Sequence, residues 1–409
     1  MPVRPFDLNL RHLRALVATV EHGSVSAAAL AVALSQPALT QGLAKLERQL
    51  AVTLLERHSA GVRPSPAGTV MAGRVTAALR QLAAASREAA RSTRGFARPE
   101  TLMTATQVRA FLALAEQGSF VAAAAAEGLS QPALHRAVRD LEQVCGVPLV
   151  ERRGRGVGLT PPGRRIARGI RLAAREIEAG IVEVTGNRGG GRIVIGAMPM
   201  SRALVLPHAI AASVRQDHRA EIVVVEGSWR DLMEPLRDGV IDLTVGSLRE
   251  QAPPDLEQRA LFVDDVAIVG RGDHPLVADP APGLDALARY GWIVGQEGTP
   301  LRAAWNALFA GRTPPFAPIE CGSVMVIRGV LLDTDLLTLL SPDQVAIELR
   351  TGTLAIVGAA TPRVRRTIGI TTRRDWHPTQ AQARFLSLLR NAVEYARLPE
   401  IQYRSGFSD

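Results

Sequence analysis

The sequence is short of lysine and of cysteine. Only Lys45 among the 48 basic residues is a lysine, so the positive charge is almost entirely arginine. The two cysteines, Cys145 and Cys321, cannot build a disulfide framework in a chain of 409 residues. Neither has a second cysteine or a histidine at metal-ligand spacing. We therefore expect two buried cysteines that pack as small hydrophobic residues, and no metal site.

Long apolar runs are also missing. Met1–Leu10 carries charges and two prolines where a signal peptide would need an apolar stretch. No segment approaches the ~18 uninterrupted apolar residues of a membrane span. The sequence therefore predicts a cytoplasmic protein with no membrane partner.

Catalytic patterns are missing as well. There is no G-x-S-x-G motif, the eight histidines are scattered, and no carboxylate pair can be placed together. We expect no catalytic residues, no cofactor and no enzyme activity.

What the chain does contain is an uneven charge. The net charge is +9 and the pI is near 10.8. Residues 1–190 hold 25 basic and 14 acidic residues, whereas the remainder has a net charge of −2. With 47% hydrophobic residues, a chain of 409 residues is long enough for two or three domains. A basic front half joined to a near-neutral back half indicates that the front half binds a polyanion.

The front half contains a tandem repeat. Arg14–Gly68 (copy one) aligns without a gap on Arg109–Gly163 (copy two), at an offset of 95 positions and with 26 of 55 pairs identical. Both copies contain a Ser-Gln-Pro-Ala-Leu block, which begins at Ser35 and Ser130, with Leu-Glu and Glu-Arg pairs in register after it. This agreement indicates a duplicated structural module.

Each copy has the helix signals of a helix-turn-helix. In copy one, apolar residues recur at helical spacing up to Val20, and Gly23 follows as a stop signal. Ser24 and Ser35 are predicted to cap two further short helices, and a β-hairpin wing follows. In copy two the predicted helices are Thr104–Gln117, Ser119–Glu127 and Gln131–Val144, and the predicted wing is near Leu149–Leu159.

Copy two has the stronger DNA-binding face. Polar and guanidinium groups at a helix N-terminus can contact base edges in the major groove, and wing arginines suit phosphates or a narrow minor groove. The predicted contacts are Ser130, Gln131, Pro132, His135, Arg136 and Arg139 of the third helix and Arg152, Arg153 and Arg155 of the wing.

The same face of copy one is weaker. Its predicted contacts are Gln36, Thr40 and Gln41 of the third helix and Arg57 and Arg63 of the wing. Gly42 lies within that helix and costs about 1 kcal/mol of helix propensity relative to alanine. Copy one is therefore an accessory DNA-binding module or a degenerate interaction module. Winged helices also serve as dimerisation or docking modules, and that alternative stays open for the pair.

A long helix follows each copy, from Pro66 to about Ser92 and from Pro161 to Val184. Each has an apolar seam, formed by Val70, Val75, Leu79 and Leu82 in the first and by Ile166, Ile170, Ile177, Ile181 and Val184 in the second. A seam of this strength needs a partner, which a second chain or the neighbouring copy would each provide.

The back half alternates short apolar strands with helices, which indicates parallel strands with right-handed crossovers in an α/β domain. Ligands of such sheets bind beyond the carboxyl ends of the strands. Small hydroxyl residues beside glycines suit a small carboxylate there, and the predicted ligand contacts are Met198, Met200, Ser201, Arg202, Ser228, Thr299, Gly322 and Ser323. Ser201, Thr299 and Ser323 can equally be plain helix N-caps.

Together these segments resemble the LysR-type transcriptional regulators. Copy two carries that family's N-terminal signature almost throughout, in Gln107–Glu116, Gly118-Ser119, Ser130–Leu134, Leu141-Glu142, Gly146-Val147, Leu149–Arg152 and Leu159–Gly163. The back half matches more loosely, through Leu206-Pro207, Leu236–Leu243, His274–Leu276 and Ser323.

The resemblance implies a multidomain protein: two all-α-rich winged helix-turn-helix modules with linker helices, then an α/β two-lobed effector domain similar to periplasmic binding proteins. It also implies homodimers or homotetramers whose contacts with double-stranded DNA change when a metabolite binds between the lobes. The expected parts are a first module (1–65) and linker helix (66–98), a second module (99–160) and linker helix (161–187), a hinge (188–191), and an effector domain (192–400) with its central lobe at roughly 268–370.

The chain departs from the family in having two modules. Copy one also has Ala51-Val52 in place of the Gly-Val pair, and Ser65 where copy two has Thr160. Two modules could span a longer operator, or copy one could pack on copy two and bury its seam. Taken alone, the back half fits a second hypothesis, a solute-binding component of a transport system. The basic front half and the missing export signal count against that hypothesis.

Overall fold

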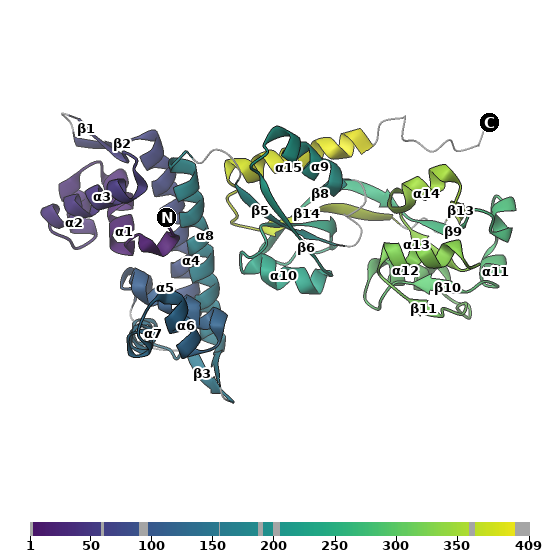
Figure 1. Ribbon diagram of the computed structural model, residues 1–409, viewed down its shortest axis with the longest axis horizontal. Helices are drawn as coiled ribbons and strands as arrows, with labels where there is room; N and C mark the ends of the chain where they lie inside the picture. The colour runs from purple at the N-terminus through teal and green to yellow at the C-terminus, as the bar shows by residue number, and fades with distance from the viewer. Residues whose placement is uncertain are drawn as a thin grey trace. The chain divides into compact units, whose positions relative to one another are not determined.

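The computed structural model describes residues 3–58, 61–89, 97–154, 156–186, 191–198, 205–359 and 365–396. They form two compact units, one of residues 1–189 with Arg237–Gly239 and the other of the remaining residues. The tandem repeat lies in the first unit and the α/β segments lie in the second (Figure 1).

Each copy folds as three helices and a two-stranded antiparallel wing. Copy one consists of α1 (Leu10–His22), α2 (Val25–Ala31), α3 (Gln36–Leu50), β1 (Leu55–His58) and β2 (Gly61–Pro64), preceded by the 3-10 turn η1 (Pro5–Asp7). Copy two consists of α5 (Ala105–Gln117), α6 (Phe120–Glu127), α7 (Gln131–Cys145), β3 (Val150–Arg153) and β4 (Gly156–Leu159), preceded by η2 (Pro99–Thr101). The predicted winged helix-turn-helix is confirmed in both copies.

Local sequence signals explain these helices. The hydroxyls of Ser35 and Ser130 accept hydrogen bonds from the backbone N–H groups of Ala38 and Ala133, both at 3.3 Å, and so cap α3 and α7. A proline follows each cap in the first turn, where its missing N–H costs nothing.

The linker helices α4 (Pro66–Ala89) and α8 (Pro161–Val184) pack side by side (Figure 1). Gly169 lies against Ala85 and Gly180 lies against Met71, so the two helices run antiparallel. The partner of each predicted seam is thus the other copy's linker helix. One seam residue was predicted wrongly: Val70 is 41% exposed, and the neighbouring Met71 is buried in its place.

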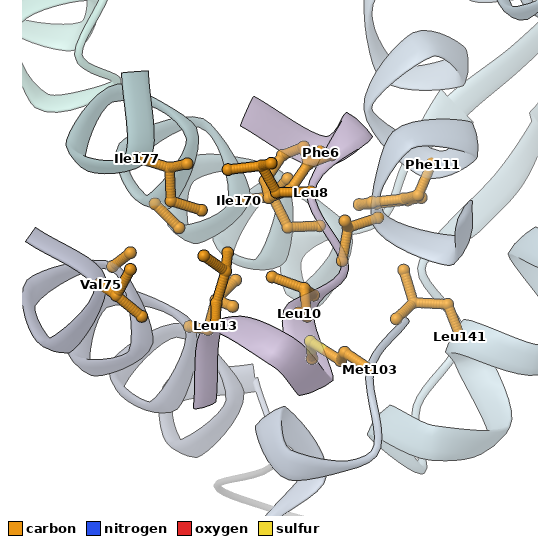
Figure 2. Close-up of a cluster of buried hydrophobic side chains, with 14 of the residues drawn as sticks. Phe6, Leu8, Leu10, Leu13, Val75, Met103, Phe111, Leu141, Ile170 and Ile177 are labelled. Atoms are coloured by element: carbon orange, nitrogen blue, oxygen red, sulfur yellow. The ribbon is translucent and has the colours of Figure 1, made fainter. Parts of the chain in front are cut away.

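A single hydrophobic core joins both copies and both linker helices. Figure 2 shows Leu10 and Leu13 of α1, and Leu8 just ahead of it, in the same cluster as Phe111 of α5 and Ile170 of α8. The front half is therefore one packed body rather than two separate modules.

The second unit contains two five-stranded sheets, each covered by helices. In the first lobe the sheet order is β6-β5-β7-β14-β8, and its elements are β5 (Arg192–Ala197), α9 (Val205–Gln216), β6 (Glu221–Glu226), α10 (Trp229–Arg237), β7 (Leu243–Ser247), β8 (Leu256–Asp265), β14 (Arg365–Arg373) and α15 (Gln380–Ala396). In the second lobe the order is β11-β10-β12-β9-β13, and its elements are β9 (Ala267–Arg271), η4 (Pro275–Ala278), α11 (Leu284–Leu287), β10 (Trp292–Val294), α12 (Pro300–Leu308), β11 (Ile319–Glu320), α13 (Val324–Leu332), β12 (Leu337–Leu340), η5 (Pro342–Val345), α14 (Ala346–Thr351) and β13 (Leu354–Ala359).

The predicted parallel strands form only part of each sheet. β5 is parallel to β6 and β7, and β10 is parallel to β11 and β12, as expected. β14, however, is antiparallel to β7 and β8, and β9 is antiparallel to β12 and β13. The chain passes from the first lobe to the second between β8 and β9 and returns between β13 and β14, which reverses the strand direction in each sheet.

The two cysteines differ in environment. Cys145 is buried as predicted, and burial raises the pKa of its thiol to about 12. Cys321 is only half-buried, because it lies in the loop that follows β11, so the prediction for it was wrong. No helix within the described ranges is long and apolar enough to cross a bilayer.

Candidate DNA-binding interface and effector site

The exposed face of α7 carries the predicted DNA contacts of copy two together. Gln131, Pro132, His135, Arg136 and Arg139 line one open hollow of about 490 Å³. Ser130, Gln131, Pro132, Arg136 and Arg139 are exposed, because the apolar residues of α7 point the other way into the core. This arrangement leaves two guanidinium groups and an amide free to meet a nucleic acid.

Two of the predicted contacts are held by neighbouring side chains. The His135 ring stacks on Phe120 of α6, with the ring centroids 3.6 Å apart. On the wing, Arg153 pairs with Glu151 at 3.2 Å, although both side chains remain largely exposed. Arg152 is exposed, and Arg155 lies outside the described residues.

The matching face of copy one has fewer cations. The Gln36 amide donates to the Ser26 hydroxyl at 2.5 Å, so it is engaged within copy one. Thr40 is half-buried, whereas Gln41, Arg57 and Arg63 are exposed.

Two features of α3 add to the sequence-based picture. Gly42 lies within the helix as expected; it is buried, and the His12 ring lies where a side chain would project. Lys45 is exposed one turn after Gln41 and adds a cation that sequence reasoning missed. The spacing of four residues between Gln41 and Lys45 was the signal that would have placed both on one face.

The repeated Leu-Glu pair has a structural role. The Glu142 carboxylate accepts hydrogen bonds from the backbone N–H groups of Leu149 and Val150, at 2.8 and 3.2 Å. In copy one Glu47 accepts from Leu54 and Leu55 in the same way. Each glutamate therefore fixes the start of a wing to the third helix of its copy, α3 or α7, which is called the recognition helix below.

In the effector domain the ends of the parallel strands converge on the junction of the lobes. β7 ends at Ser247, which pairs with Ile368 near the start of β14. Ser341, which follows β12, donates a hydrogen bond to Asp264 near the end of β8, at 2.6 Å. In both lobes the carboxyl ends thus face the segments that connect the lobes, where ligands of such sheets bind.

A buried polar group that sequence reasoning missed lies at this junction. Asp264 accepts the Ser341 hydrogen bond through one carboxylate oxygen and a 2.6 Å bond from Arg366 through the other. All three side chains are at most 9% exposed. Burial lowers the pKa of Arg366, and the Asp264 charge opposes that shift. Asp264 and Arg366 are 102 residues apart, so no local pattern could have paired them.

The predicted ligand contacts occupy different environments. Met198 is buried in the first lobe's core against Gly246. Thr299 caps α12 by accepting from the Arg302 backbone N–H, and Ser228 donates to Asp231 at 2.6 Å. Gly322 and Ser323 are exposed, and Ser323 makes no capping bond. Met200, Ser201 and Arg202 lie outside the described residues.

Comparison with known proteins agrees with the division of the chain into two helix-turn-helix copies and a two-lobed α/β domain. A family model described as "Bacterial regulatory helix-turn-helix protein, lysR family" matches residues 10–69 and again residues 105–164. A model of the LysR substrate binding domain matches residues 186–394. In the part of the chain that the structure describes, no three histidine, cysteine or acidic side chains are grouped to hold a metal.

Individual relatives differ in how much of the chain they cover. The HTH-type transcriptional regulator GalR of Pseudomonas putida is 31% identical over 392 residues, which are 94% of this chain and 97% of that protein. The HTH-type transcriptional regulator PcaQ of Agrobacterium fabrum is 28% identical and covers 71% of this chain and 93% of its own. The crystal structure of ArgP from Mycobacterium tuberculosis shares the fold at 18% identity, with a TM-score of 0.57 over 70% of this chain and 96% of its own.

Proposed function

This chain belongs to the LysR-type family of transcriptional regulators and is an effector-responsive DNA-binding regulator, in which, we propose, copy two provides the principal DNA contacts. The relatives are named as regulators of transcription, so the transport hypothesis has no support. We further propose that the protein acts in the cytoplasm, has no enzyme activity, and has the domain limits given by the sequence.

One observation carries the assignment of copy two. Arg136 and Arg139 project from the same exposed face of α7 as Gln131. The equivalent positions of copy one hold Gln41 and Ala44, which bring no cation. A well-placed bidentate arginine contact to a base is worth about 1–3 kcal/mol of discrimination, so the two copies contribute unequally.

The test uses the full chain and a duplex selected by that chain from a random-sequence library. We expect Arg136→Ala with Arg153→Ala to weaken binding of the selected duplex by a few kcal/mol, because a base contact and a wing contact are both lost. Gln41→Ala, at the position equivalent to Arg136, should have a smaller effect.

Arg219→Ala is the matched control, since it removes one exposed arginine from the effector domain. Affinities are measured by fluorescence anisotropy at one fixed salt concentration, because phosphate contacts make affinity depend on salt. Unchanged affinity in the copy two double variant would reject copy two as the principal DNA-binding module.

For the effector domain we propose a small carboxylate, an aromatic or sugar-derived acid, bound between the lobes. Ser228, Thr299, Gly322 and Ser323 follow the carboxyl ends of β6, β10 and β11 and remain our proposed contacts. Met200, Ser201 and Arg202 follow β5 and belong to the same proposal. Met198 is left out, because its side chain packs in the core.

A thermal-shift screen with benzoate and gluconate tests this proposal. A ligand at 100 times its Kd stabilises the folded protein by about 2.7 kcal/mol. Ser323→Ala should weaken a hit by about 1 kcal/mol without altering the fold, since Ser323 caps no helix. Ser387→Ala on α15 serves as the control. A hit that binds the Ser323→Ala variant with unchanged affinity would remove Ser323 from the site.

The family's regulators oligomerise, and we propose that this chain forms homodimers or homotetramers. Because the apolar seams of α4 and α8 already face each other within one chain, further assembly would use other surfaces.

A further inference from the structure

The two copies contact each other in a nearly two-fold arrangement. Arg14 of α1 donates hydrogen bonds to the backbone carbonyls of Thr101 and Met103, at 2.7 and 3.2 Å, ahead of copy two. Arg109, the equivalent residue of α5, binds Asp7 ahead of copy one at 3.2 Å. The turn η1 packs on α8, and η2 packs on α4. Equivalent elements therefore exchange equivalent contacts, as two subunits do across a two-fold axis.

The linker helices repeat this symmetry. Ala85 of α4 lies against Gly169 of α8, and Arg74 of α4 lies against Gly180 of α8. With the offset of 95 residues, Gly169 is the equivalent of Arg74 and Gly180 is the equivalent of Ala85. Antiparallel pairing places the beginnings of α4 and α8, and so the two copies, at opposite ends of the helix pair (Figure 1).

At one point the symmetry is broken by charge. Arg74 is bound by two carboxylates of α8, Glu183 at 2.7 and 3.0 Å and Glu176 at 3.1 Å. Arg74 and Glu176 side chains are 10% and 11% exposed. The symmetry-related place has Gly169 against Gln81, with no ion pair.

Pairing of like helices from two chains would lose this match. Two α8 helices would place the buried Glu176 and the half-buried Glu183 opposite Gly169, which supplies no cation, and an unpaired buried charge is strongly destabilising. Two α4 helices would place Ala85 against Arg74, at the position that Gly180 occupies in the pair of α4 with α8. A methyl group at Gly180 would lie 2.8 Å from the Met71 sulfur and 3.1 Å from Arg74 Cβ, so the Ala85 side chain would be crowded there. Both like pairings are therefore disfavoured relative to α4 with α8.

We propose that a single chain is a complete, asymmetric two-module DNA-binding unit, which recognises two unlike half-sites in one fixed order. The ion pair of Arg74 with Glu176 and Glu183 selects the pairing within the chain. Unlike half-sites follow because the exposed positions differ: Gln41 and Lys45 in α3 correspond to Arg136 and Asp140 in α7. This inference rests on the proposed DNA-binding function, but the pairing itself can be tested without DNA.

The pairing is tested by charge reversal in the full chain. Arg74→Glu alone, or Glu176→Arg with Glu183→Arg alone, should lower the melting temperature of the front unit by about 10 °C, because a buried ion pair is broken. Combining all three changes in one chain should recover most of the loss. Co-expressing the two complementary chains should recover nothing, because each α4 still faces the α8 of its own chain. Recovery on co-expression would show pairing between chains and overturn the proposal.

A second measurement does not depend on how well the reversed pair folds. The wild-type chain selects duplexes from a library with 40 random base pairs, and the enriched sequences are aligned. Two unlike elements at fixed order and spacing support the proposal, and an inverted repeat of one element overturns it. Gln41→Ala with Lys45→Ala should relax selection at one element only, and Arg136→Ala at the other only. No enrichment of any duplex would instead contradict the proposed DNA-binding function, while the melting temperatures still decide the pairing.

Discussion

Ala51 and Gly146 occupy the same position in the two copies, directly after the recognition helix. Both have a left-handed backbone, with φ of 53° and 68°. A left-handed conformation costs a residue with a Cβ about 1–2 kcal/mol, whereas glycine adopts it freely. Copy one therefore carries strain at a position where copy two has none.

We expect Ala51→Gly to stabilise copy one by about 1 kcal/mol and Gly146→Ala to destabilise copy two by a similar amount. Hydrogen exchange in the full chain measures both, because α3 and α7 give separate peptides. Exchange from the fully protected amides should slow in α3 about fivefold for the first variant and quicken in α7 for the second. Equal exchange rates in wild type and both variants would contradict the backbone strain that we infer at Ala51.

We expect His274 to make the second lobe sensitive to acid. Its Nδ1 accepts a hydrogen bond from the Leu276 backbone N–H at 3.1 Å, and its Nε2 lies 3.3 Å from the Asp335 carbonyl oxygen, so the neutral ring fits. Burial lowers the pKa of His274 below 6.5, against the opposing effect of the Asp335 contact. Protonation in the unfolded chain then begins at a higher pH than in the folded chain.

The contribution of His274 to the stability of the second lobe should consequently be present above the unfolded pKa of about 6.5 and be lost as the pH falls below it, because the unfolded state binds the additional proton. His274→Asn retains an acceptor for the Leu276 N–H and should flatten this dependence. Hydrogen exchange of β9 and β13 between pH 5 and 7.5, corrected for intrinsic rates, follows the effect. The same slope in wild type and variant would show that another group titrates.

At the scale of elements, each wing depends on one glutamate of its recognition helix. Removing Glu142 leaves the N–H groups of Leu149 and Val150 without their acceptor. Hydrogen bonds to a charged group contribute about 1.5–3 kcal/mol, so Glu142→Ala should destabilise the β3–β4 wing by about 2 kcal/mol.

The control for Glu142→Ala is Glu151→Ala, which removes an exposed carboxylate of the wing that pairs with exposed Arg153. Exchange of the β3 and β4 amides should accelerate at least tenfold in the first variant and little in the second. Similar acceleration in both would assign the wing's stability to its surface charges.

Elements with local signals were predictable from the sequence, and those that depend on distant partners were not. The cap Ser35 correctly marked the start of α3, and the predicted helix Gln131–Val144 is one residue shorter than α7. The antiparallel direction of β9 and β14 was not predictable, because it depends on pairing with β13 and β8, which lie far away in the sequence. For the same reason the exposed arginines of α7 were predictable, whereas the Asp264 and Arg366 pair was not.

At the scale of the whole molecule, net charge alone favours copy one, whereas we propose copy two as the principal DNA-binding module. Residues 1–100 hold 13 basic and 6 acidic residues, and residues 101–190 hold 12 and 8, so the copy one half is the more positive. Part of that surplus is not available to DNA, since Arg14 and Arg74 are largely buried in contacts between the copies. Our proposal for copy two therefore rests on the placement of the charges rather than on their sum.

Arg57 and Arg152 offer a matched test of which copy contacts the DNA, because they occupy equivalent, exposed positions on the two wings. If both wings contact phosphates of one duplex, each Arg→Ala change should reduce the slope of log K against log salt concentration by about 1. The loss of affinity should be similar for the selected duplex and a scrambled one, since phosphates carry no sequence information. Arg136→Ala should instead weaken the selected duplex more than the scrambled one. A slope that changes for Arg152→Ala but not for Arg57→Ala would show that only copy two meets the DNA, and copy one would then serve as the intrachain partner that holds copy two in place.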